Sequence, residues 1–134
     1  MLLLTISLLL LSCSNGDNSS NSSNNCQTLH PPLWIQGTWI KQNSPIGNTG
    51  YKFTSDDVID IFSQSSSNSR KYQLDFYCNS NVHYTVTEST TPTSYFLEIN
   101  WGGIATYNFT KISNTMIELV NDNDPVNATY FIKQ

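Results

Sequence analysis

The sequence predicts an all-β domain, a small antiparallel up-and-down β-barrel of about eight or nine strands that follows a disordered tether. Apolar and polar residues alternate with a period of two in several short segments, which is typical of strands with one buried face. Turn-forming clusters of Asn, Ser, Pro and Gly separate these segments. A length of 134 residues leaves room for one domain, which we expect to occupy residues 27–134.

Nine segments carry the strand pattern. Residues 73–78 are among them, because Leu74, Phe76 and Cys78 alternate with polar neighbours and would face inward. Residues 55–61 could instead begin a helix capped by Ser55, but their β-branched side chains favour a strand after a turn. No segment shows helical periodicity, and closing the meander into a barrel would remove its unpaired edges. The predicted strands are residues 34–41, 51–54, 58–63, 73–78, 82–88, 94–101, 104–112, 115–120 and 128–133.

The first twelve residues predict an export signal. Their apolar run is uncharged and far shorter than the roughly 20 residues of a transmembrane helix. Leu10-Leu11-Ser12-Cys13 resembles the lipobox of bacterial lipoproteins. The resemblance implies that the Cys13 thiol becomes a diacylglyceryl thioether, which carries fatty acyl chains such as palmitate, and that the chain is cleaved before Cys13. An ordinary secretory signal that is cut elsewhere is the alternative.

Residues 13–26 would form the lipidated Cys13 and a flexible tether. Between Cys13 and Cys26 the chain offers no apolar side chain whose burial could offset the entropy of ordering. Twelve such residues span about 17–21 Å by random-coil scaling. Several acyl chains anchor a protein stably, so we expect a membrane-bound protein of the bacterial cell envelope. Ser14 after the anchor favours the outer membrane over the inner membrane.

The domain resembles the small lipocalin-like lipoproteins of bacterial envelopes. Gly37-Thr38-Trp39 is similar to the Gly-x-Trp motif on the first lipocalin strand, and residues 51–58 and 128–133 look like the second and last strands. The resemblance implies that Gly37 lets the strand bend and that Trp39 closes one end of the barrel. Larger lipocalins often place an Arg from the last strand over this Trp, and here the corresponding residue is Lys133.

Chemical motifs are scarce, so we expect a protein that is not an enzyme and needs no cofactor. His30 and His83 lack metal-ligand spacing and are expected at the surface. The two acidic clusters, around Asp57 and in residues 121–125, lack the Gly and Glu of an EF-hand loop. A net charge of -4 provides no basic face for nucleic acid.

Elimination predicts a disulfide between Cys26 and Cys78. If Cys13 is lipidated, these two thiols remain in a compartment that permits oxidation. The alternative is that Cys78 is a small buried hydrophobe and Cys26 a free residue.

Two functions follow as hypotheses. The first is a lipid-anchored carrier that binds a small, largely apolar molecule inside the barrel. The second is an interaction or inhibitor module with a solid core, whose loops bind another envelope or host protein; its acidic surface would suit a basic partner. A cavity of a few hundred Å³ in the interior would favour the carrier.

Overall fold

The computed structural model describes residues 26–45, 47–121 and 124–134, with the side chains of residues 121–127 excepted. Nine strands and one helix follow one another along these residues. They are β1 (Gly37–Lys41), β2 (Gly50–Phe53), β3 (Val58–Ser63), β4 (Ser66–Ser69), α1 (Arg70–Asn79), β5 (Thr85–Thr90), β6 (Ser94–Asn100), β7 (Ile104–Lys111), β8 (Met116–Asn121) and β9 (Asp124–Lys133).

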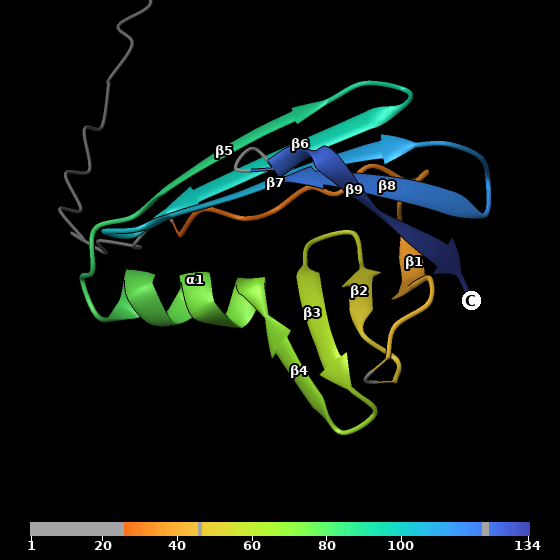
Figure 1. Cartoon of the computed structure of the whole chain (residues 1–134). Helices are drawn as coiled ribbons and strands as arrows, with labels where there is room; N and C mark the ends of the chain where they lie inside the picture. Colours follow the sequence, from red (N-terminus) through yellow and green to blue (C-terminus); the bar gives the residue numbers. More distant parts are fainter. Residues whose placement is uncertain (1–25, 46, 122–123) are drawn as a thin grey trace, which may run out of the picture.

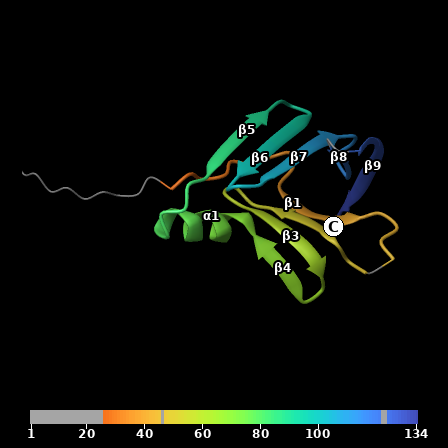
Figure 2. The same cartoon turned by 60° about the vertical axis from the view of Figure 1, so that its left-hand side comes forward.

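All nine strands belong to one antiparallel sheet, in the order β4-β3-β2-β1-β9-β8-β7-β6-β5. Each strand pairs with its neighbour in the sequence, apart from the pairing of β1 with β9 and the break between β4 and β5. The sheet curls into a half-barrel, and α1 spans the open side between its two edge strands (Figures 1 and 2). The predicted fold class, an all-β antiparallel up-and-down architecture, is confirmed.

The core lies on the concave face of the sheet. Alternate residues of β6 point inward, and Tyr95, Leu97 and Ile99 are almost fully buried. The sheet has two halves, β1–β4 and β5–β9. Phe53 in β2 and Phe109 in β7 meet edge to face with ring centroids 5.1 Å apart, so aromatic rings pack the two halves together. In β6, the alternation of buried and less buried residues that the sequence predicted is present.

The expected strand at residues 73–78 is wrong, because this segment lies within α1. Ser69 caps the helix by accepting the backbone N–H of Tyr72 at 3.0 Å. Leu74 is buried, but Phe76 is largely exposed, so the apolar residues do not share one inward face. The nine strands are completed by β4, which occupies Ser66–Ser69 where a turn was expected.

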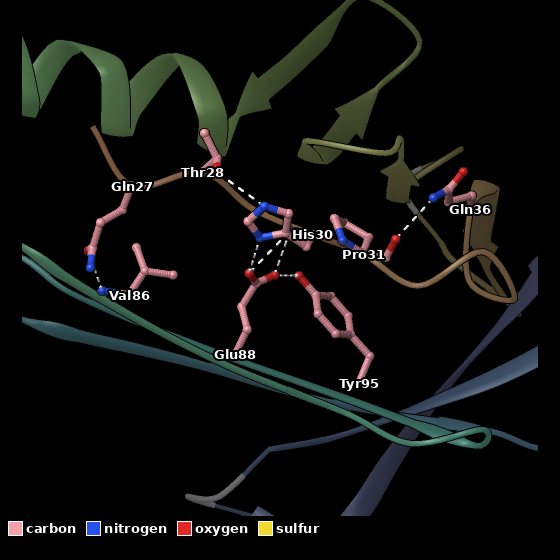
Figure 3. A network of polar contacts seen from close by, with 8 residues as sticks. All are labelled: Gln27, Thr28, His30, Pro31, Gln36, Val86, Glu88 and Tyr95. Carbon is pink, nitrogen blue, oxygen red and sulfur yellow. Dashed lines mark hydrogen bonds and ion pairs between the residues drawn. The ribbon is translucent and has the colours of Figure 1, made fainter. Parts of the chain in front are cut away.

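Residues 26–36 run between α1 and the strands β5 and β6 before entering β1 (Figures 1 and 3). Leu29 and Ile35 in this segment are fully buried. The segment therefore fills the open side of the half-barrel and belongs to the core. Residues 1–25, which contain the expected signal, Cys13 and most of the tether, lie outside the described residues.

Candidate functional site

An open pocket of about 340 Å³ lies at one end of the concave face. Its walls come from strands of both halves of the sheet and from the first residue of α1. Aromatic and aliphatic side chains supply the apolar surface, and the charged residues are an ion pair and Lys41. The residues that line the pocket include Tyr51, Asp60, Arg70, Tyr107, Leu119 and Phe131.

Two of the charged residues in the pocket, Arg70 and Asp60, form an ion pair. A terminal guanidinium nitrogen of Arg70 contacts Asp60 Oδ2, and both side chains are largely buried. The same nitrogen donates to the hydroxyl of Tyr107 at 2.5 Å, and the other terminal nitrogen donates to Gln73 Oε1 at 3.0 Å. Arg70 also lies over the Tyr107 ring, 5.5 Å from its centroid. The cation is thus held in one position at the edge of an apolar pocket.

Arg70 is placed there by the start of α1. Asp57 accepts the backbone N–H of Lys71 at 2.8 Å and the Ser69 hydroxyl at 2.6 Å, so its carboxylate holds the first turn of the helix against the sheet. Asp60 follows on β3, directly opposite Tyr51 on β2. Asp57 therefore positions the start of α1, and Asp60 neutralises the charge of Arg70 at its first residue.

Burial alters the ionisation of the pocket. It raises the pKa of Asp60 above its ordinary value, and the neighbouring Arg70 opposes this rise. Burial also raises the pKa of Tyr51 and Tyr107, and the Asp60 charge adds to both shifts. The tyrosine hydroxyls therefore stay protonated at neutral pH and can donate hydrogen bonds.

Gly50 allows β1 and β2 to approach closely beside the pocket. A Cβ atom at this position would lie 1.9 Å from the backbone oxygen of Trp39. No residue with a side chain fits such a contact without movement of the backbone. Beside Gly50, the ring of Tyr51 packs against those of Phe109 and Phe131, with ring centroids 5.2 Å away in each case.

A second polar cluster fastens residues 26–36 to the sheet (Figure 3). The backbone N–H of His30 donates to both carboxylate oxygens of Glu88, at 2.9 and 3.1 Å, and the buried Tyr95 hydroxyl donates to the same carboxylate at 2.6 Å. Nearby, Val86 N–H donates to Gln27 Oε1 at 2.9 Å. These contacts give the edge strand β5 polar partners from the N-terminal segment.

The residues of the Gly-x-Trp resemblance lie beside the end of the chain. Trp39 is buried, and its indole N–H donates to the backbone oxygen of Ile35. Lys133 Nζ lies 5.1 Å from the Trp39 ring centroid, so a cation from the last strand does cover this ring. Gly37 has φ of +126°, a backbone conformation that favours glycine.

The two cysteines lie together. Cys26 Sγ and Cys78 Sγ are 2.06 Å apart, at disulfide distance, and the Cα atoms are separated by 5.5 Å. The expected placement of Cys78 on the inward face of a strand is wrong, since it lies in the last turn of α1. The bridge therefore ties the start of the described chain to the end of the helix.

The histidines and acidic clusters that were considered as metal ligands do not come together in one site. His30 and His83 are exposed, and the carboxylates near Asp57 are divided between the helix cap and the Arg70 pair. The side chains of the second acidic cluster, residues 121–125, lie outside the described part. Among the side chains that are described, no three His, Cys, Asp or Glu residues gather as a metal ion would require.

The pocket itself was not predicted from the sequence. Arg70, the only arginine of the chain, follows a run of serines and carries no motif. Tyr51 and Tyr107 are strand residues whose alternation predicts burial but not a pocket. The unusual feature that could have directed attention here is a single Arg in a chain of low charge.

Comparisons with known protein families, with characterised proteins and with solved structures find no match for this chain. The described ranges contain no helix with the length and apolarity that a membrane span requires.

Proposed function

We propose that this protein is a lipid-anchored envelope protein that binds a small, largely apolar molecule in the concave pocket. The observation that carries the proposal is the pocket of about 340 Å³ between the two halves of the sheet. Its volume falls within the range of roughly 300–1,000 Å³ that is usual for small-molecule sites. A solid interior would instead favour the interaction module.

The lining suggests how such a molecule would be oriented. Leu119, Phe131 and the faces of Tyr51 and Tyr107 would contact its apolar body. A polar group on the ligand would lie toward Arg70 and Asp60, where it could exchange hydrogen bonds with the pair. Because Asp60 neutralises Arg70, the ion pair by itself offers no net charge, and Lys41 is the remaining charged residue of the lining.

The anchoring part of the proposal rests on the sequence before the described residues. Cys13 lies in the lipobox-like segment, and twelve polar residues separate it from Cys26. A carrier attached in this way would stay within a short distance of the bilayer, where apolar molecules are concentrated. This position suits an open pocket rather than a closed one.

Ligand binding is tested with the fluorescent apolar probe N-phenyl-1-naphthylamine and the full chain. We expect a saturable rise in probe emission with one site per chain. Leu119→Trp should abolish it, because a larger side chain fills the pocket. Ile112→Trp, at an exposed turn residue, is the matched control and should bind as the wild type does. Equal binding by Leu119→Trp would exclude the pocket as the site.

Anchoring is tested separately by labelling cells with radioactive palmitate. The wild-type chain should incorporate the label, and Cys13→Ala should accumulate as an unlabelled precursor. Labelling that persists in Cys13→Ala would exclude this residue as the anchor. Native mass spectrometry of protein purified from its own host would then show whether a ligand is retained in the pocket.

A further inference from the structure

Aromatic side chains gather at the end of the domain where the chain enters it. Phe76 and Tyr77, in the last turns of α1, have ring centroids 6.1 Å apart. Tyr77 also lies 6.2 Å from the ring centroids of both Tyr84 and Trp101. Tyr72 is one helical turn before Phe76 on the same side of α1. We call this set the entry face: Tyr72, Phe76, Tyr77, Tyr84 and Trp101.

Part of the entry face is not covered by the residues that the structure describes. Tyr72 is 73% exposed and Phe76 is 57% exposed, the two highest values among the aromatic residues of the domain. Single exposed apolar residues are common on protein surfaces, but two aromatic rings at i and i+4 beside a cluster of others are not. An apolar patch of this kind indicates a contact surface.

The path of the chain indicates what that surface meets. Cys26 is bridged to Cys78 in α1, and the backbone N–H of Gln27 donates to the Tyr84 hydroxyl at 3.1 Å. The polypeptide before Cys26 therefore joins the domain at the entry face. Only twelve residues separate this point from Cys13, so an anchor there would hold the entry face nearest to the bilayer.

The charge distribution agrees with contact to lipid. The three segments that meet at this end, residues 26–30, 76–84 and 100–105, contain no Asp, Glu, Lys or Arg, although the chain as a whole carries a net charge of -4. On α1 itself, Lys71 pairs with Asp75 at 2.9 Å and Arg70 pairs with Asp60. An anionic headgroup layer would thus meet a surface without net negative charge.

We propose that the entry face lies against the lipid headgroups, with the Tyr72 and Phe76 rings inserted at the interface. This inference rests on the proposed anchoring at Cys13. Aromatic residues favour the membrane–water interface, where their rings are partly buried and their polar atoms stay hydrated. The contact orients the domain, so that α1 lies along the surface and its first residue, Arg70, brings the pocket close to the bilayer.

The test uses the full lipidated chain on vesicles of phosphatidylcholine and phosphatidylglycerol, with part of the phosphatidylcholine brominated in its acyl chains. Two variants each add one tryptophan at an exposed position. Phe76→Trp lies on the entry face, and Ile112→Trp lies beyond the far end of β7, about 27 Å from residue 104 at the near end. Emission of the wild-type chain is subtracted from both.

We expect the brominated lipid to remove most of the emission added by Phe76→Trp and none of that added by Ile112→Trp. Acrylamide in the aqueous phase should quench the two residues in the opposite order. Equal acrylamide quenching of both, without an effect of bromine, in protein that floats with the vesicles would overturn the orientation and leave the anchoring intact. Protein that does not float with the vesicles would overturn both proposals.

Discussion

The carboxylate of Asp57 accepts the backbone N–H of Lys71 at 2.8 Å and thereby caps a helix that begins on the other side of a β-hairpin. The same carboxylate accepts the hydroxyl of Ser69, the residue that caps the helix from within its own segment. Two caps from different parts of the chain therefore determine where α1 starts. Because Arg70 is the first residue of that helix, they also determine the position of the cation in the pocket.

Asp57→Ala should destabilise the protein by about 1–3 kcal/mol, because two partly buried donors lose their acceptor. Urea unfolding followed by circular dichroism measures this loss. Asp56→Ala, which changes the exposed neighbour, is the control and should stay within about 0.5 kcal/mol of the wild type. Equal unfolding free energies for the two variants would contradict the capping role of Asp57.

Trp39→Ala should be among the most destabilising substitutions, with a loss of about 3–5 kcal/mol. The side chain is almost completely buried and contributes both packing and the hydrogen bond to Ile35. The melting temperature by differential scanning calorimetry tests this expectation, with Leu33→Ala as an exposed control. A Trp39→Ala protein that melts with the control would show that this ring does not support the fold.

Protein taken from the envelope without reduction should show no alkylatable thiol at Cys26 or Cys78 by intact-mass measurement. After reduction, both should react. The bridge joins residues separated by 52 positions, for which loop-closure entropy predicts a stabilisation of about 4 kcal/mol at most. The Cys26→Ser and Cys78→Ser variants should therefore lose stability by similar amounts. Two reactive thiols in the unreduced protein would refute the bridge.

The stability of the domain should fall as the pH rises above about 10, the ordinary pKa of tyrosine. Burial raises the pKa of Tyr51, Tyr95 and Tyr107, and the hydrogen bond to Glu88 adds to the shift of Tyr95. Above pH 10 the unfolded chain has thus released protons that the folded chain retains, so the free energy of unfolding decreases with pH.

Urea unfolding between pH 8 and pH 11 measures this slope. Tyr95→Phe should have a shallower slope than the wild type, because one linked proton is gone. Leu33→Ala, which changes an exposed residue that does not titrate, should keep the wild-type slope. A slope in Tyr95→Phe equal to that of the wild type would exclude Tyr95 as a linked group.

Sequence patterns predicted most of the sheet because most strands alternate apolar and polar residues, which shows which side of the strand is buried. In β6 the alternation of Tyr95, Leu97 and Ile99 reflects contact with one core, and short polar turns join most consecutive strands. The helix was mispredicted as a strand because its apolar residues are spaced by two, although only Leu74 among them is buried. Its local signal was composition: no β-branched residue occurs between Arg70 and Asn79.

The pocket depends on contacts between distant segments, which no local pattern reports. Arg70 and Asp60 belong to different elements, and Tyr107 approaches them from the other half of the sheet. Similarly, β4 has no apolar alternation and exists because its backbone pairs with β3. Such features follow from the fold as a whole. They could be predicted only after the strand order was known.

The pairing of β1 with β9 has a consequence for how the chain folds. Trp39 pairs with Lys133, about ninety positions later, whereas the other ladders join strands that are consecutive in the sequence. Consecutive hairpins close quickly, and a contact between distant segments has the greater entropic barrier. During synthesis from the N-terminus, β1 therefore waits without its second neighbour until the final ten-residue strand is made. Until then both sheet halves have an additional open edge, so the nascent domain is most exposed to aggregation just before completion.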